Sequence, residues 1–300
     1  MLQFLSDLQQ FRFLQYALLT GLMASVACGI IGSYVTVRRI TYIAGAIAHC
    51  TLGGMGIAGY LHKEQGLTFL TPLTGAVCAA LLAALVISYM LHRSTMRLDT
   101  ILSAVWAIGM AVGIIFISKT GGYNKDLMSY LFGDILMVSD QDLLLITVLD
   151  LIVTALVLLF YNRLVAISFD EEFARISGIR VDLYNTLFLC LVALTVVLLV
   201  QVVGIILVVA LLALPAAAAG QMTTRLPAMM LLAIFFCAVS TTGGLFISYA
   251  PNLPAGATIV MLAGFLYLAS IFAVKIRRRE TPPGWCMTLT AMDSIGLFVR

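Results

Sequence analysis

Apolar tracts long enough to cross a membrane recur along almost the whole chain. A helix needs about 20 residues to cross ~30 Å of hydrocarbon. We count nine such tracts, at residues 13–36, 40–61, 67–91, 99–118, 143–161, 183–201, 203–221, 226–249 and 255–274. Only 10% of the residues are charged, whereas about a quarter are charged in soluble domains, and the alternating pattern of a β-barrel is missing. The sequence therefore predicts an all-α polytopic membrane protein with eight to nine transmembrane helices.

The tracts divide the chain into three parts. Residues 1–12 mix apolar and polar side chains and are expected to lie at the membrane interface. Residues 13–275 form the transmembrane domain, and residues 276–300 a tail. The uncharged tract from Leu183 to Gly220 is too long for one crossing, so a turn is predicted near residues 201–204.

Basic residues are distributed unevenly between the loops on the two sides. Cytoplasmic loops carry an excess of Lys and Arg. If the amino terminus is outside, twelve basic residues are cytoplasmic, namely Arg38, Arg39, Arg93, Arg97, Arg163, Arg175, Arg180, Arg225, Lys275, Arg277, Arg278 and Arg279. Four lie outside, namely Arg12, Lys63, Lys119 and Lys125. The asymmetry predicts an external amino terminus and a cytoplasmic carboxyl terminus.

A short charged segment, residues 168–178, separates two long apolar tracts and has the sequence SFDEEFARISG. Ser168 and Glu171 have the spacing of a capping box, in which each side chain bonds a backbone N–H at a helix start. The acidic residues of the first turn are Asp170, Glu171 and Glu172, at the positive end of the helix dipole. Gly178 occupies the position of a left-handed stop. The pattern predicts a short helix on the cytoplasmic side.

The same segment has one apolar face, because Phe169, Phe173 and Ile176 recur at i, i+4 and i+7. A helix this short is marginal alone in water, so the face is expected to contact something. Two interpretations remain at this point. The face rests on the membrane or on its own bundle, or it is offered to a soluble partner.

His49 is the one histidine inside a predicted span. Gly45, His49 and Gly53 are spaced i, i+4 and i+8, so the imidazole lies on a face of small residues where helices approach closely. An intramembrane ionisable residue is a candidate functional site, although a histidine bonded between helices for packing gives the same pattern. A neutral imidazole suits zinc, manganese or iron. One histidine is not a metal site, so further ligands have to come from elsewhere.

Two other residues inside the spans stand out. A lone carboxylate such as Asp150, near the middle of the fifth span, costs roughly 2.5–3.5 kcal/mol to insert. It is expected to have a partner or to be protonated. It could be a metal ligand, a proton relay, or a carboxyl that faces a water-filled cavity or a neighbour's backbone. Pro215 is predicted to kink the seventh span, and residues 216–220 to allow tight packing after it.

No catalytic constellation is present. The sequence has no GxSxG, no HExxH and no Walker phosphate loop, so the chain is not expected to be an enzyme. Its six cysteines include no CxxC pair, which argues against a disulfide framework or a zinc knuckle. If transport is driven by ATP, the hydrolase is a separate polypeptide.

Five stretches together resemble the membrane permeases of bacterial ABC importers for manganese, zinc and iron. They are spread over most of residues 13–275. The stretches are ALLTGLMASVACGIIGSYVTVRR, AHCTLGG with His49, LFGDIL, DEEFARISGI and VGIILVVALLALPAAAA. The resemblance implies the ABC importer permease fold in a bacterial inner (plasma) membrane, with no bound cofactor and the metal ion as cargo. It also implies a second permease subunit, two cytoplasmic ATPase subunits and an extracytoplasmic metal-binding protein.

The resemblance also implies roles for individual residues. The segment from Asp170 looks like the family's coupling helix, which inserts into the ATPase, and its residues are Asp170, Glu171, Glu172, Ala174 and Gly178. In the family, an aspartate one turn before the second-span histidine joins it in a metal site across the dimer. Here that position is Gly45. Three outcomes are open: a sister permease that keeps the aspartate, a site rebuilt with Cys50 or Asp150, or a cargo that prefers nitrogen or sulfur ligands.

These observations favour the permease subunit of an ATP-driven importer of a divalent transition metal. Metal would arrive from the external protein and pass the helix seams near His49. The rival is a proton- or sodium-coupled secondary transporter in which His49 and Asp150 are intramembrane relay groups. That rival needs no ATPase subunit.

Overall fold

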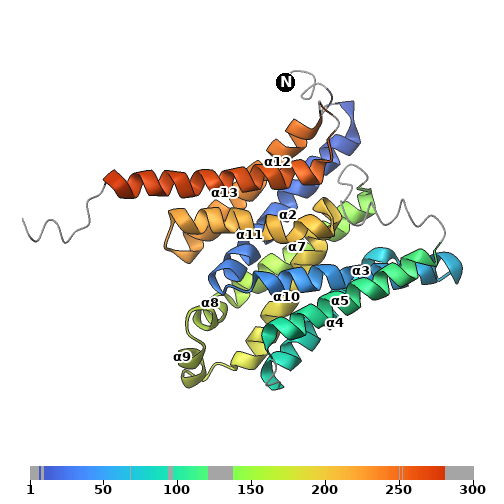
Figure 1. Cartoon of the computed structure of the whole chain (residues 1–300), viewed down its shortest axis with the longest axis horizontal. Coiled ribbons are helices and arrows are strands. Elements are labelled where there is room, and N and C mark those ends of the chain that lie inside the picture. The colour runs from blue at the N-terminus through green and yellow to red at the C-terminus, as the bar shows by residue number, and fades with distance from the viewer. Residues whose placement is uncertain are drawn as a thin grey trace, which may run out of the picture.

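The computed structural model describes residues 7, 10–67, 69–93, 97–120, 138–249, 251 and 253–280. These residues contain helices and no strand. In chain order the helices are α2 (Arg12–Val37), α3 (Thr41–Glu64), α4 (Pro72–Arg93), α5 (Leu98–Ser118), α7 (Asp140–Leu159), α8 (Tyr161–Phe169), α9 (Glu171–Ile176), α10 (Val181–Val203), α11 (Ile205–Met222), α12 (Leu226–Tyr249) and α13 (Ala255–Glu280) (Figure 1). The predicted all-α membrane fold is confirmed.

Each of the nine predicted spans coincides with one helix, namely α2, α3, α4, α5, α7, α10, α11, α12 and α13. Within the described part of the chain, seven helices are by themselves long and apolar enough to cross a membrane. The pair α7 and α8 makes an eighth, bent by 72° at Phe160. Helix α11 adds a shorter apolar stretch, Val208–Met222. The bend directs α8 out of the line of the span and toward α9.

The uncharged double span turns where the sequence predicts. Helix α10 ends at Val203 and α11 begins at Ile205, so Gly204 alone separates them. Gly204 has φ +80° and ψ 166°, a conformation that is essentially confined to glycine. The chain can therefore break one helix and start the next within a single residue.

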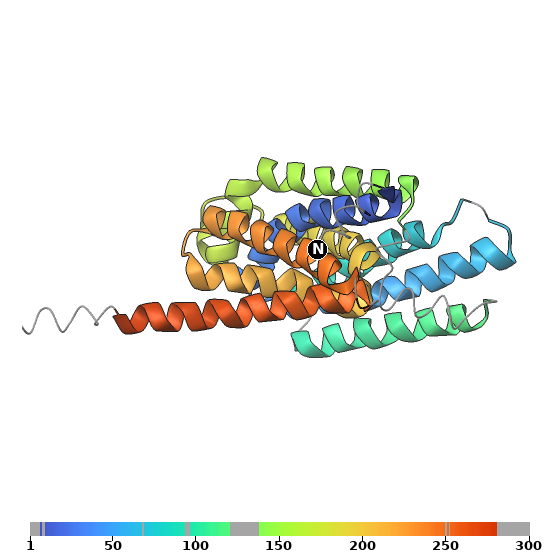
Figure 2. The same cartoon turned by 90° about the horizontal axis from the view of Figure 1, so that it is seen from above.

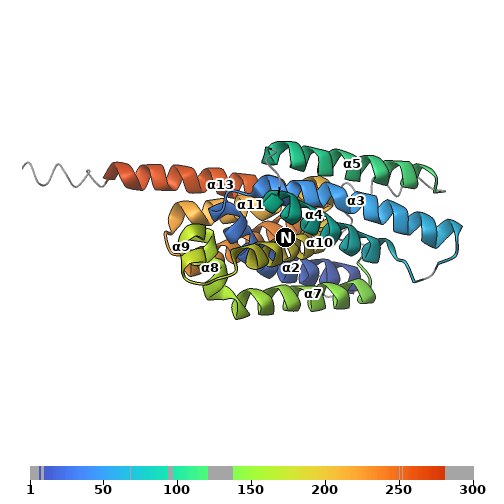
Figure 3. The same cartoon turned by 90° about the horizontal axis from the view of Figure 1, so that it is seen from below.

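Helix α2 lies in the middle of the bundle. It packs against α12, α11, α7 and α10, and its residues from Ala27 to Val35 are buried without interruption. Helix α3 packs against both α4 and α5, whereas α7 and α5 lie on opposite sides of the bundle (Figures 2 and 3). His49 on α3 and Asp150 on α7 are therefore carried by different sides of the bundle.

Pro215 lies inside α11, and its missing N–H leaves the carbonyl four residues earlier without its helical donor. That carbonyl belongs to Leu211, and the thiol of Cys28 in α2 donates to it at 3.2 Å. The contact between α2 and α11 is close here, because a Cβ built on Gly32 would lie 2.3 Å from the Leu212 carbonyl oxygen. The same Cβ would lie 3.4 Å from the Cβ of Ala216, so one small residue after Pro215 takes part in this close contact. The predicted kink at Pro215 stays a prediction.

Several helix ends gather at one end of the bundle. We call it the arginine end, after Arg38, Arg39, Arg163, Arg175 and Arg225. One cleft there is lined jointly by the α2–α3 turn, the tips of α4 and α5, α8, α9 and the start of α10. A second cleft joins the α2–α3 turn to the α11–α12 turn. Helices α8 and α9 and the far end of α13 also lie at this end (left in Figure 1).

Two predictions fall largely on residues outside the described ranges. The interfacial segment at residues 1–12 is described only at residues 7 and 10–12, and the tail only up to residue 280. Helix α13 extends to Glu280, so the first five residues of the predicted tail, from residue 276, continue the last span as a helix.

Candidate functional site

The short helix predicted in the charged segment is α9, and it starts later than predicted. Helix α8 continues through Ser168, whose hydroxyl donates to the carbonyl of Leu164 at 2.7 Å. The predicted capping box between Ser168 and Glu171 is therefore wrong. Asp170 is extended, with φ −152° and ψ 101°, and its carboxylate accepts a bond from the Phe173 amide at 2.9 Å. A carboxylate at the N-cap satisfies an otherwise unpaired backbone donor, so Asp170 caps the helix instead.

The other end of α9 is as predicted. Gly178 has φ +79°, and its amide donates to the Arg175 carbonyl at 3.1 Å. The amide of Ile179 donates to the Ala174 carbonyl at 3.0 Å. These two bonds make a Schellman motif, which needs a left-handed residue after the helix. Glycine at this position lets the chain turn directly into α10.

The predicted apolar face of the segment is exposed. Phe169 is 66%, Phe173 63% and Ile176 87% exposed, and Glu172 is exposed beside them. Only Ala174 of α9 is buried; it packs in a small cluster with Ile167, Val181 and Tyr184. The face therefore does not rest on the bundle of its own chain, which leaves the membrane and a soluble partner as the two surfaces that it could contact.

A polar network joins α9 to the end of α2. Nη2 of Arg38 donates to Oε1 of Glu171 and to Oδ1 of Asn185, each at 2.8 Å. Nδ2 of Asn185 donates to the same Glu171 oxygen at 3.3 Å. The guanidinium also lies over the ring of Phe188, 5.1 Å from its centroid. Burial lowers the pKa of Arg38, and the neighbouring Glu171 carboxylate opposes that shift.

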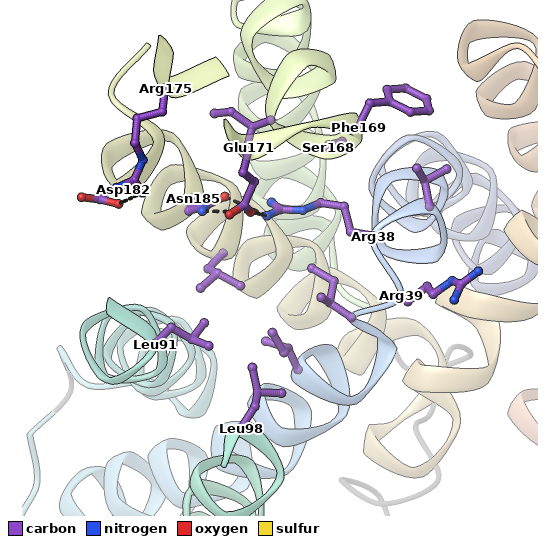
Figure 4. A pocket seen from close by; sticks show the side chains of 15 residues that line it. Arg38, Arg39, Leu91, Leu98, Ser168, Phe169, Glu171, Arg175, Asp182 and Asn185 are labelled. Carbon is purple, nitrogen blue, oxygen red and sulfur yellow. Dashed lines mark hydrogen bonds and ion pairs between the residues drawn. The ribbon is translucent and has the colours of Figure 1, made fainter. Parts of the chain in front are cut away.

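The network forms one wall of a cleft of about 660 Å³ at the arginine end. Figure 4 shows Arg38, Glu171 and Asn185 meeting on that wall, with Leu91 and Leu98 on the opposite side. Leu91 and Leu98 belong to the tips of α4 and α5. Sequence reasoning did not assign Arg38 or Asn185 to this site, because Arg38 and Glu171 are 133 residues apart and no local pattern links them.

His49 lies on the predicted seam, and the helix across that seam is α5. A Cβ built on Gly53 would lie 2.8 Å from the Gly109 carbonyl oxygen of α5. The His49 imidazole stacks on the indole of Trp106, with centroids 4.2 Å apart and planes 12° from parallel. Its Nδ1 is buried and has no hydrogen-bond partner among the described residues. Packing thus orients the imidazole, and its Nδ1 is available to bind another group.

The described residues contain no group of three or more His, Cys, Asp or Glu side chains that could hold an ion. Asp150 lies on α7, where its carboxylate accepts a bond from the Ala27 amide of α2 at 3.0 Å. Cys50 packs against Gly109 and lines an apolar groove between α4 and α5. A Cβ on Gly45 would lie 3.2 Å from Val209 Cγ2, so this position has little room for a side chain.

The chain is similar to known membrane transport proteins along most of its length. The profile of the ABC 3 transport family matches residues 10–274. An uncharacterized membrane protein, slr2045, of Synechocystis is 39% identical over 266 residues, covering 87% of this chain and 91% of that protein. The manganese transport system membrane protein MntC of Listeria monocytogenes is 37% identical over 273 residues, covering 91% and 95%.

A solved structure agrees with these relatives. It is that of PsaBC from Streptococcus pneumoniae in complex with Fab, which superimposes with a TM-score of 0.80 at 34% identity and covers 89% of this chain and 94% of that one. The long apolar helices of the described part of the chain fit the same class. The chain belongs to the ABC 3 transport family and is a membrane permease of a metal ABC transporter.

Proposed function

We propose that this chain is the permease subunit of an ATP-driven importer of a divalent transition metal, with manganese as the first candidate. The observation that carries the proposal is the exposed apolar face of Phe169, Phe173 and Ile176 at the arginine end. Apolar surface of this kind is stabilised by burial against a partner. Since the sequence has no phosphate-binding loop of its own, the partner is an ATPase subunit. The Listeria relative belongs to a manganese transport system, which supports the choice of metal.

The proposed orientation puts the arginine end in the cytoplasm. Cytoplasmic loops are rich in Arg and Lys, and Arg38, Arg39 and Arg175 all line one cleft at this end. Two ATPase subunits would bind the α9 segments of two permease chains through residues 170–178. An extracytoplasmic binding protein would deliver metal at the opposite end, where α3 ends and α4 begins.

The proposed metal path passes His49 and is completed by a second permease chain. Trp106, on which His49 stacks, is 37% exposed, so this part of the α3–α5 seam lies near the protein surface. A hard cation such as manganese favours carboxylate oxygen, and Gly45 supplies none. A sister chain that retains an aspartate at that position would provide the missing ligand, and the two chains would form a heterodimer.

The direct test is reconstitution. The chain is expressed with candidate ATPase and sister permease subunits, inserted in proteoliposomes with the metal-binding protein, and assayed for uptake of manganese, zinc and ferrous iron. We expect uptake that needs ATP and persists after the proton and sodium gradients are collapsed. Uptake that continues without ATP and stops with an uncoupler would instead support a secondary transporter and would overturn the proposal.

A further inference from the structure

Helix α9 is attached to the bundle by a small number of contacts, and these contacts differ in kind. Ala174 fills a small apolar cluster. Arg175 and Asp182 form an ion pair at 3.5 Å, with side chains 69% and 68% exposed, and exposed pairs of this kind contribute little. A further attachment is the pair of Arg38 and Glu171, which joins α9 to the end of α2.

The Arg38 side chain is held from several directions, whereas its partner is accessible. Arg38 is 14% exposed and Glu171 51%. Nη2 of the guanidinium donates to both Glu171 and Asn185, and the guanidinium plane lies over Phe188. A lysine ammonium can donate such bonds but has no plane to lie over the ring. A displacement of α9 therefore pulls on a side chain that is fixed to the ends of α2 and α10.

The backbone at Arg38 leads directly to the helix that carries His49. Arg38 is the C-cap of α2, and the amides of Arg39 and Ile40 donate to the carbonyls of Thr36 and Val35 at 3.2 and 3.1 Å. This is a Schellman motif with an arginine where glycine is usual. Arg39 has φ +58° and is the one non-glycine residue with positive φ in the described ranges.

The junction is short and under strain. A non-glycine residue in the left-handed region costs energy, and such residues are frequent at functional sites. Helix α3 begins at Thr41, and His49 follows about 12 Å further on, at 1.5 Å per residue. The cleft of about 660 Å³ beside Arg38 separates α9 from the tips of α4 and α5, so α9 has room to move toward them.

We propose that Arg38 is a positioning residue that transmits the movement of α9 to the α2–α3 junction and so to His49. The proposal rests on the proposed function, because α9 has to be moved by an ATPase subunit. It adds the residue within the permease that receives the movement, and it assigns Asn185 to hold Arg38 and Glu171 in register.

The test measures metal transported per ATP hydrolysed, in the complete complex in proteoliposomes. The variants are Arg38→Gln, Arg38→Lys, Glu171→Gln and the double variant Arg38→Gln/Glu171→Gln. Arg225→Gln is the matched control, because it removes an exposed arginine from the same end, in the turn before α12. Co-purification of the ATPase subunits reports assembly separately.

We expect Arg38→Gln to keep its ATPase subunits and its ATP hydrolysis and to transport at least about tenfold less metal per ATP, as for loss of a charge-assisted hydrogen bond. Arg38→Lys is expected to lie between the wild type and Arg38→Gln. The double variant is expected to be no worse than Arg38→Gln, since contacting residues that act together are not additive. A structural role alone would lower assembly and hydrolysis together and leave the ratio unchanged.

An unchanged ratio in Arg38→Gln, or effects that multiply in the double variant, overturns the inference. If Arg38→Gln does not assemble, Glu171→Gln decides, because it alters the exposed half of the pair. A wild-type complex that shows no ATP-dependent uptake would reject the proposed function. A wild-type complex that transports while Arg38→Gln remains fully coupled rejects only the role of Arg38.

Discussion

The imidazole of His49 lies flat on the indole of Trp106, with the ring centroids 4.2 Å apart. The two side chains come from α3 and α5, so the stack forms only where the glycines of the seam let the helices meet. Packing fixes the direction of the ring while Nδ1 keeps no partner among the described residues. The arrangement is suited to hold a ligand that comes from outside this chain.

Replacing Trp106 tests whether the stack orients His49. Aromatic pairs contribute about 0.5–1.5 kcal/mol beyond their buried area, so Trp106→Ala is expected to weaken metal uptake by up to about tenfold. Trp106→Phe keeps a ring and is expected to change uptake by about twofold or less. Initial uptake rates against metal concentration provide the measurement. Equal losses in both variants would mean that size and not stacking matters.

Two glycines of α3, Gly54 and Gly59, are expected to respond differently to substitution by alanine. A Cβ on Gly54 would lie 2.1 Å from the Gly75 carbonyl oxygen of α4, whereas a Cβ on Gly59 meets nothing within 4 Å. We expect Gly54→Ala to lower the free energy of unfolding by about 1–3 kcal/mol. Gly59→Ala is expected to be neutral or to stabilise by up to about 1 kcal/mol. Unfolding midpoints of the purified permease in detergent measure both, and a destabilised Gly59→Ala would contradict the assignment.

The contact between α3 and α5 shows which part of the fold can be predicted from the sequence. Spacing alone predicts that Gly45, His49 and Gly53 share a packing face, because 3.6 residues per turn is a local property. Gly109 and Gly113 of α5 are also spaced i and i+4, a small-residue pattern typical of helix contacts. A local pattern does not say which helix it meets, so the sequence does not predict that α5 covers this face. The spans and the turn at Gly204 follow from length and composition in the same local way.

The N-cap of α9 gives a second contrast. The Asp170 carboxylate accepts from the Phe173 amide, and loss of such a cap costs about 0.5–2 kcal/mol, so Asp170→Ala is expected to loosen α9 and reduce ATPase binding. Ser168→Ala removes only a bond to Leu164 within α8 and is expected to leave binding unchanged. Co-purification of the ATPase subunits is the measurement. A larger loss of ATPase binding in Ser168→Ala than in Asp170→Ala would contradict the N-cap at Asp170 and support the capping box between Ser168 and Glu171.

The capping box was wrong for a reason that lies outside its own segment. Its residues have the correct spacing, but α8 continues to Phe169 because Ile167 and Leu164 are buried against the bundle. Tertiary burial therefore outweighs a local signal that is worth only about 1 kcal/mol. The contact of Arg38 with Glu171 was missed for the same reason, since it depends on how two distant helix ends meet.

Gly45 offers a test of the metal site. A Cβ there would lie 3.2 Å from Val209 Cγ2, so an aspartate needs space that Val209→Ala would provide. If His49 is a metal ligand, Gly45→Asp/Val209→Ala is expected to increase the affinity for manganese more than for zinc, because carboxylate oxygen suits the harder ion. Gly45→Ala/Val209→Ala is the matched control. Competition between the two metals in uptake assays reports the preference, and no difference from the control would argue against a site at this position.

Asp150 separates the importer from the proton-coupled alternative. Its carboxylate accepts the Ala27 amide of α2 at 3.0 Å, a bond that the side-chain oxygen of asparagine can also accept. Asp150→Asn is therefore expected to retain folding and most uptake, whereas Asp150→Ala leaves the Ala27 amide without that acceptor, at a cost of about 1–3 kcal/mol. A proton relay would behave differently, because asparagine cannot titrate: uptake would stop in Asp150→Asn although the protein remains folded. Uptake and unfolding midpoints measured on the same preparations distinguish a carboxylate that ties α7 to α2 from one that moves protons.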